Sequence, residues 1–229
     1  MLETGIAFGL AGEELVADAS GALYWPREEA LIVADLHFEK GSAFARRGIF
    51  LPPYDTRASL AALERALARL GARRVIALGD SFHDTGGSSR ISRAEHETLL
   101  GLMRGRDWIW VLGNHDPAPP GLPGTAVAEI ALGGLLLRHE PQPGAPAGEI
   151  AGHLHPCATV RGGGGRARRR CFVTDGRRLV LPAFGAYAGG LDVFHEAFDA
   201  LLTRPFEVFV LGRERAYRIP DRRLARNAA

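Results

Sequence analysis

Aspartate, asparagine and histidine recur along this 229-residue chain at the ends of short apolar runs. Each run is typical of a strand buried on both faces. Formation of such a strand does not explain why Asp, Asn and His follow it. The side chains in these clusters are Asp35, His37, Asp80, Asn114, His139, His153 and His155. Strands joined by crossover helices form binding sites outside their carboxyl ends, so we expect the seven side chains to lie close together.

The types of these side chains favour a metal centre. Carboxylate, carboxamide and imidazole ligands without a Cys thiolate suit divalent Mn, Fe or Zn, and the spacing leaves all three open. Seven ligands are too many for one tetrahedral ion. With one shared carboxylate they fit two ions about 3.5–4 Å apart, the arrangement used for in-line attack on phosphorus. A single histidine at a strand end is ordinarily a surface residue, so the prediction depends on the whole set.

Three other histidines are interpreted as ordinary residues. His96 lies on the polar side of a predicted helix, and His195 lies beside a Phe-rich stretch. His83 follows Asp80 closely and is able to contact a substrate, but we interpret it as a loop histidine.

The first half of the chain alternates strands with helices, which favours parallel strands and crossover connections. Buried strands are predicted over residues 30–34, 74–78 and 108–112. A leucine stripe predicts a helix over 56–70 that ends at Gly71. Ser92 and Glu95 form a capping-box pattern, which predicts a second helix from Ser92 to about Arg104.

The second half is predicted to consist of antiparallel strand pairs. Gly133-Gly134 and Asp175-Gly176 each separate two apolar runs, and a last hairpin is predicted over 206–219. We find neither an internal repeat nor a linker rich in Pro, Ser and Gly. We therefore predict one domain over residues 1–229, in which two sheets pack together.

Composition places the chain among ordinary globular proteins, with 46% apolar and 24% charged residues. A net charge of +2 gives no general reason to expect nucleic acid or membrane as a partner. The two cysteines form no CxxC pattern, and neither a signal peptide nor an apolar run long enough to span a membrane is recognised. We expect a cytoplasmic protein without a membrane partner.

The positive charge is concentrated in one segment. It contains Arg161, Arg166, Arg168, Arg169 and Arg170. We expect a flexible basic loop beside His155, in which Arg168, Arg169 and Arg170 hold a phosphate backbone. The alternative is a solvated surface loop without a binding role. Phe184 and Tyr187 are interpreted as packing residues, with base stacking as the alternative.

The ordered motifs resemble the calcineurin-like metallophosphoesterase family. They are Asp35-x-His37, Gly79-Asp80, Gly113-Asn114-His115-Asp116, His139 and Gly152-His153-x-His155. The resemblance implies an α/β fold of two packed mixed β-sheets flanked by helices, and a dinuclear centre. Asp35, His37 and His155 would hold the first ion; Asn114, His139 and His153 the second; and Asp80 would bridge them. His115, paired with Asp116, would assist the leaving group or the phosphate rather than bind metal.

A narrower resemblance is to the bacterial ligase-associated DNA-damage-response endonuclease subfamily, PdeM. It is carried by residues 35–40, 44–48 and 79–84, by Pro52, and by the Gly-rich segment 181–190. This resemblance implies DNA cleavage, and partners that include DNA and DNA-repair proteins such as an ATP-dependent ligase.

From the residues and the resemblance we predict a metal-dependent phosphodiesterase, and specifically a DNA endonuclease linked to repair. A hydroxide activated by two divalent ions, with manganese preferred over iron or zinc, would attack phosphorus. The ions and Asn114 would offset charge on the nonbridging oxygens, and His115 would protonate or hydrogen-bond the departing oxygen. Asp116 would orient the His115 ring. The alternatives are a small-molecule phosphodiesterase or pyrophosphohydrolase and, with less support because the ligand set is intact, a non-enzymatic scaffold.

Overall fold

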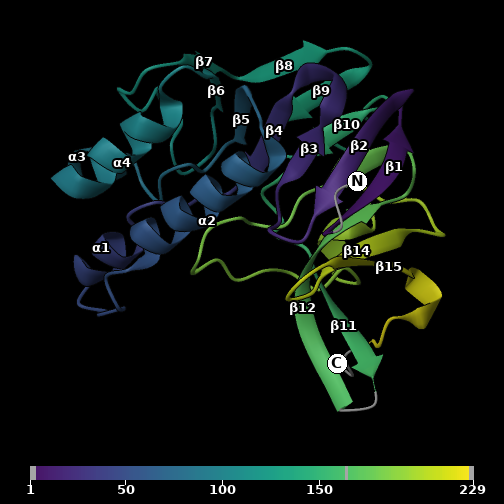
Figure 1. Cartoon of the computed structure of the whole chain (residues 1–229). Coiled ribbons are helices and arrows are strands. Elements are labelled where there is room, and N and C mark those ends of the chain that lie inside the picture. Colours follow the sequence, from purple (N-terminus) through teal and green to yellow (C-terminus); the bar gives the residue numbers. More distant parts are fainter. Residues whose placement is uncertain (1–3, 163–164, 227–229) are drawn as a thin grey trace.

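The computed structural model describes residues 4–162 and 165–226, and within them two β-sheets pack face to face (Figure 1). The first sheet has the strand order β1-β2-β3-β4-β5-β6-β7. The second has the order β15-β14-β12-β13-β10-β9-β8, and β11 pairs with β12 outside this path. The predicted fold class, two packed mixed sheets flanked by helices, is confirmed.

The first sheet is antiparallel at its beginning and parallel at its end. Its strands are β1 (Gly5–Leu10), β2 (Glu13–Asp18), β3 (Leu23–Trp25), β4 (Ala30–Ala34), β5 (Arg74–Leu78), β6 (Asp107–Val111) and β7 (Thr125–Val127). Strands β1 to β4 pair antiparallel, and β4 to β7 pair parallel. The parallel strands β4, β5 and β6 therefore all end at the same edge, as the sequence predicts.

The helices lie mainly between the parallel strands of the first sheet. They are α1 (Lys40–Ala45), α2 (Asp55–Leu70), α3 (Gly87–Arg90) and α4 (Arg93–Met103), with short 3-10 helices at Pro26–Glu28, Glu196–Phe198 and Asp221–Arg223. The two predicted long helices are confirmed as α2 and α4. At the start of α4, the Ser92 hydroxyl accepts from the Glu95 amide, which is the first half of the predicted capping box, and it donates to the Glu95 carboxylate.

Successive side chains of β4 and β5 point to opposite faces of the first sheet, and both faces are covered. Leu31, Val33 and Val75 pack against α2 and α4 on one face of the sheet. Ile32 and Ile76 point the other way and pack against the second sheet. The continuous apolar runs in the sequence therefore serve two cores at once.

The second sheet is mixed. Its strands and the adjoining arm are β8 (Glu129–Leu132), β9 (Leu135–Arg138), β10 (Glu149–Ala151), β11 (Cys157–Gly162), β12 (Gly165–Thr174), β13 (Arg178–Val180), β14 (Glu207–Leu211) and β15 (Ala216–Pro220). Antiparallel pairing is confirmed for β8 with β9, β12 with β13, and β14 with β15. It is wrong for β10, which pairs parallel with both β9 and β13. The loop 139–148 returns the chain to the starting side, so β9 and β10 end at the same edge.

The basic segment is not the flexible loop that the sequence predicts. Strands β11 and β12 form an antiparallel hairpin in which Arg161 faces Arg166 and Cys157 faces Arg170. Figure 1 shows this hairpin extending away from the two sheets. The part of the prediction that falls on residues 163–164 lies outside the described residues. Backbone pairing fixes the direction of alternate side chains, so these arginines have defined faces.

Within the described ranges, no helix combines the length and apolar character required to cross a membrane.

A buried ion pair fastens α2 to the first sheet. The Asp18 carboxylate is fully buried and accepts from the Arg69 guanidinium at 2.6 and 2.7 Å. Burial alone would raise the pKa of Asp18, but hydrogen bonds from Arg69, Ser20 and Thr4 outweigh burial and hold the pKa at about 2. The ionised carboxylate therefore stabilises the folded state.

We predict that Asp18→Asn removes an acid-sensitive part of the stability. The folded-state pKa of Asp18 lies below its ordinary value of 3.8. The carboxylate therefore contributes about 2 kcal/mol above about pH 4, and this contribution is lost as the pH falls toward 2. Urea unfolding between pH 2 and 7 should show a difference between wild type and variant that shrinks over that window. Asp107→Asn, at an exposed pair, is the control; a pH-independent difference for Asp18→Asn would contradict the prediction.

Candidate metal centre

The seven predicted ligands meet at one edge shared by both sheets. From the first sheet come Asp35 and His37 after β4, Asp80 after β5, and Asn114 after β6; from the second come His139 after β9, and His153 and His155 after β10. Their ligand atoms form close groups. The parallel pairing of β9 with β10, which the sequence did not predict, is what places the histidines of the second sheet beside the first.

Asp35, His37 and His155 form the first group. The two Nε2 atoms of His37 and His155 lie 3.4 Å apart, and His155 Nε2 lies 3.3 Å from Asp35 Oδ1. Ligand atoms bonded at about 2.0–2.2 Å to one ion lie about 3.0–3.5 Å from each other. The group is therefore spaced as the resemblance implies for the first ion.

The second group surrounds the His139 ring. His139 Nδ1 lies 3.1 Å from the Leu78 carbonyl, which can only accept, so this nitrogen carries a proton. The other nitrogen, Nε2, lies 2.9 Å from Asn114 Oδ1 and 3.2 Å from His153 Nδ1. In neutral His139, the lone pair on Nε2 would point at the lone pairs of Asn114 Oδ1, and the two atoms would repel each other. A cation bound between them removes this repulsion.

Asp80 lies between the two groups. Its Oδ1 is 3.4 Å from His139 Nε2, and its Oδ2 is 3.9 Å from His37 Nε2. The two carboxylate oxygens therefore face different groups, which is the geometry that a bridging ligand requires.

The electrostatics of the site favour added positive charge. Asp35 and Asp80 are buried, and the ion pairs found for them in the described part of the chain involve only histidines. Asp35 Oδ1 is buried without a hydrogen-bond partner. Burial would lower the pKa of His139, but its hydrogen bond with Asp80 and the charges of Asp35 and Asp80 raise that pKa to about 9. The residues present fit divalent cations.

The imidazole of His37 is suited to ligation. Burial lowers the pKa of His37 to about 3, against the attraction of Asp80, so its ring is neutral at physiological pH. Metal ligation requires the neutral ring, because the lone pair on nitrogen forms the bond.

Five of the seven ligand residues adopt the left-handed backbone conformation that non-glycine residues rarely use. They are Asp35, His37, Asp80, His153 and His155, with φ between 44° and 67°. Such strain persists only where surrounding contacts impose it, and it concentrates at functional sites. These strained backbones turn the side chains inward from the strand ends.

His115 lies at the edge of this centre with its side chain 38% exposed, so a substrate can reach it. Its Nδ1 lies 2.7 Å from the His83 carbonyl and therefore donates to it, which leaves Nε2 facing the site. Nε2 lies 3.9 Å from Asp80 Oδ2.

The expectation that Asp116 orients the His115 ring is wrong. The Asp116 carboxylate accepts from the backbone amides of Gly113 and Phe82, and the His83 carbonyl holds the ring instead. Asp116 therefore joins the loops that follow β5 and β6. Burial raises the pKa of Asp116 to about 6.

His83 has a larger place in the site than the sequence interpretation gives it. Its ring lies 5.2 Å from the His37 ring and 5.0 Å from the His115 ring, and its Nδ1 lies 3.4 Å from His37 Nδ1. The signal in the sequence was its position three residues after Asp80. His96 and His195 stay outside the site, and His195 caps a 3-10 helix.

The three arginines predicted to bind substrate have different environments. Arg169 is exposed, and Arg168 donates to the Gly190 carbonyl while remaining largely exposed. Arg170 is half-buried and donates to the Ala183 carbonyl at 2.7 Å. Its Nη1 atom is thereby bonded to protein carbonyls, which gives Arg170 a structural contact, and its predicted contact with substrate stays a prediction.

Two packed mixed sheets with Asp, Asn and His side chains at their shared edge define a metallophosphoesterase. The chain belongs to the calcineurin-like phosphoesterase family, which it matches over residues 30–176. That range contains all seven predicted ligands together with His115.

Among solved structures, the chain is similar to the nuclease MPE of Pseudomonas putida. The two are 30% identical, with 93% of this chain and 100% of that chain covered, at a TM-score of 0.73. The Escherichia coli phosphoesterase Yfce shows a lower likeness, with 16% identity, 83% and 97% coverage, and a TM-score of 0.41. No curated protein sequence matches the chain. The likeness to the nuclease is consistent with the endonuclease subfamily that the motifs indicate.

We predict that Gly79→Ala disrupts metal binding while Gly71→Ala does not. Both glycines have left-handed backbones, with φ of 69° and 65°, so alanine costs each about 1 kcal/mol of stability. A Cβ at Gly79 would lie 2.3 Å from the His139 ring, whereas a Cβ at Gly71 meets nothing within 4 Å. The rise in Tm on addition of Mn²⁺ should be large for wild type and Gly71→Ala and small for Gly79→Ala. Equal rises in the two variants would contradict the role of His139.

Proposed function

We propose that this phosphoesterase is a manganese-dependent DNA endonuclease of the repair type. The observation that carries the proposal is the position of the hairpin β11–β12, called the arginine arm, directly after His155. A Cβ at Gly190 would lie 2.1 Å from the His155 carbonyl, so the two residues touch. Arg168 donates to the carbonyl of the same Gly190. Gly190 is therefore the residue that separates the Arg168 side chain from His155, a proposed metal ligand.

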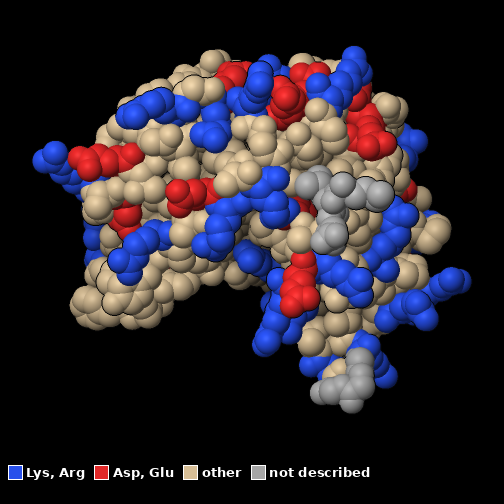
Figure 2. Space-filling view, viewed as in Figure 1, with Lys and Arg blue, Asp and Glu red and all other residues tan. Residues whose placement is uncertain are grey.

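The charge on the arm suits a polyanion. Residues 157–170 include five arginines and no Asp or Glu. Figure 2 shows a hollow between the arm and the lobe at lower left, with Lys and Arg side chains on the surface beside it. A surface rich in cations next to a phosphoesterase centre attracts a phosphate backbone and raises the rate of encounter.

The proposed chemistry is hydrolysis of a phosphodiester. When bound, two divalent ions supply Lewis-acid polarisation of the phosphoryl group and a water of lowered pKa. Asn114, whose Oδ1 faces His139, keeps its amide NH₂ group for a nonbridging phosphate oxygen. His115, held at Nδ1 by the His83 carbonyl, acts in its doubly protonated form: it gives the Nε2 proton to the departing oxygen and is left neutral.

The likeness to a nuclease along nearly the whole chain supports a nucleic acid over a small diester as the substrate. The resemblance of the motifs to the ligase-associated endonuclease subfamily favours DNA, and with it we infer DNA-repair proteins, such as an ATP-dependent ligase, as partners. One domain over residues 1–229 and a cytoplasmic location remain predictions.

The proposal is tested by incubating the protein and Mn²⁺ with covalently closed single-stranded circular DNA. We expect wild type to linearise the circle, which offers no end to an exonuclease. Asp80→Asn should lower the rate at least about 100-fold, because even residues behind a metal ligand cost 10–100-fold. Gel analysis of the linear product measures both rates.

Asp107→Asn, at the amino end of β6, is the matched control and should cleave like wild type. If the circles stay intact while a generic bis-aryl phosphodiester is cleaved, the endonuclease proposal is wrong and the protein is a small-molecule phosphodiesterase. Near-wild-type cleavage by Asp80→Asn would contradict the proposed centre.

The arginine arm is tested through the salt dependence of DNA binding. Arg166 and Arg168 alternate along β12 on one face, so Arg166→Ala with Arg168→Ala removes two charges from that face. The slope of log K against log salt for single-stranded DNA should fall by about 1.4, or 0.7 for each lost phosphate contact. The control removes Arg73 and Arg104, two exposed arginines at the opposite, amino end of β5 and β6. An unchanged slope in the arm variant would make the arm a solvated surface.

A further inference from the structure

A recess of about 550 Å³ lies between α1, the loop after it and the Gly-rich segment 183–190. Its main lining residues are Lys40, Phe44, Leu51, Pro52 and Tyr187, with small residues at 186 and 188–189. We call it the Phe44 recess. The walls are mostly apolar with one cation, and the volume is in the range of sites that hold small organic groups.

The Phe44 recess begins beside the proposed reaction centre. The Phe44 ring lies 5.5 Å from the His83 ring, which in turn lies 5.0 Å from the His115 ring. A group bound in the recess would therefore be joined to the phosphate at the centre by a short linkage.

Tyr187 provides a fixed aromatic wall. Its hydroxyl donates to the carbonyl of Pro52, another lining residue, at 2.9 Å, and its ring is half-buried. Phe184, three residues earlier, is 3% exposed and packs in the core, as expected. The expectation of packing therefore holds for Phe184, whereas Tyr187 lines an open site.

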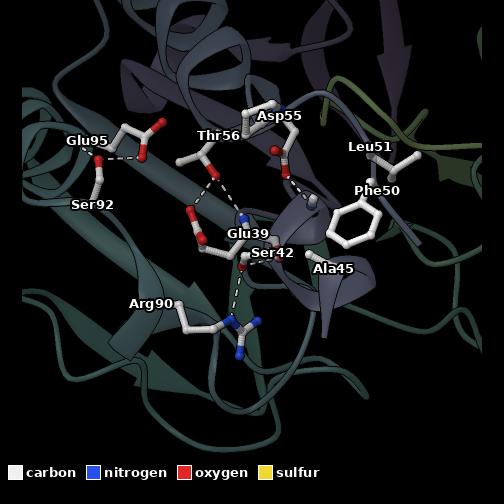
Figure 3. Close-up of a pocket in the computed structure, with 12 residues that line it drawn as sticks. Glu39, Ser42, Ala45, Phe50, Leu51, Asp55, Thr56, Arg90, Ser92 and Glu95 are labelled. Atoms are coloured by element: carbon white, nitrogen blue, oxygen red, sulfur yellow. Dashed lines mark hydrogen bonds between the residues drawn. The ribbon is translucent and has the colours of Figure 1, made fainter. Parts of the chain in front are cut away.

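The opposite wall is rigid because buried polar groups anchor α1. Figure 3 shows the neighbouring cavity, about 610 Å³ in volume, where Thr56 bonds to Glu39 and Asp55 accepts from the Gly41 amide. These hydrogen bonds fasten both ends of the short segment 39–41 to the start of α2. An anchored α1 keeps Phe44 in place before a ligand arrives.

One cation belongs to the lining, and two more follow α1 in the chain. Lys40 lines the recess, with its Nζ 5.9 Å from the Phe44 ring centroid, and Arg46 and Arg47 are exposed just after α1. Cations placed in this way suit the phosphates that flank a bound base.

We propose that the Phe44 recess takes one unpaired nucleobase of the DNA strand, next to the phosphate that is cut. This inference rests on the proposed endonuclease function. An aromatic ring, apolar walls and adjacent cations are the parts from which single-strand binding surfaces are built. A base inside a duplex is stacked between its neighbours and cannot enter, so the strand must present that base unpaired.

The test uses single-stranded oligonucleotides of one sequence, each with one abasic position, incubated with wild type and Mn²⁺. At one fixed offset from the abasic position, we expect cleavage to fall about tenfold compared with the same phosphate in the intact oligonucleotide, as for one lost stacked base. Tyr187→Ala should abolish this position dependence. Tyr187→Phe, which keeps the ring and loses only the bond to Pro52, should retain it.

Tyr217→Ala is the matched control, because Tyr217 is 47% exposed on β15 and lines neither cavity. Cleavage by wild type without position dependence would overturn the base site and leave the endonuclease intact. Absence of cleavage of every oligonucleotide would overturn both proposals. A change in sedimentation of Tyr187→Ala with an unchanged cleavage pattern would assign the recess to a second copy of the chain.

Discussion

The whole site depends on two buried carboxylates that have no lysine or arginine partner among the described residues. Removing Asp35 and Asp80 from water is unfavourable unless positive charge compensates them. Imidazoles surround both, and one of them, His139, takes up a proton readily because that charge is needed. The strained backbones at the strand ends serve the same requirement, since they turn ligands from two sheets toward one place. A pair of divalent cations satisfies this arrangement where ordinary ion pairs do not.

Much of the fold and most of the site follow from local patterns in the sequence. The apolar runs predict β4, β5 and β6, and the polar residues after them predict a centre, because parallel strands share an edge. The parallel pairing of β9 with β10 and the rigid arginine arm could not be predicted in this way. Both depend on tertiary contacts: a loop that returns the chain to the starting side, and strand pairing across a basic segment. The partners of Asp116 were missed for a similar reason, since they are backbone amides and carry no residue signature.

The Gly-rich segment 183–190 connects the parts that surround the centre. Near its start, the Gly185 amide donates to the Asp35 carbonyl, and Arg170 donates to Ala183. In the middle, Tyr187 donates to the Pro52 carbonyl at the lining of the Phe44 recess. At the end, Gly190 touches His155 and accepts from Arg168. The metal centre, the recess and the arginine arm thus share one short stretch of backbone, and small residues there permit the close approach.

Strand β12 belongs to two structures at once. Its first part, through Arg170, pairs with β11 in the arm, and from Cys171 onward it pairs with β14 in the second sheet. The same extended backbone continues through both parts. The direction of the arm is therefore set by the strand that leaves the sheet, and the proposed nucleic acid would meet the arm at that angle. The angle depends on how β12 pairs within the second sheet. If that pairing shifted by one residue, every arginine side chain on the strand would point to the opposite face of the arm.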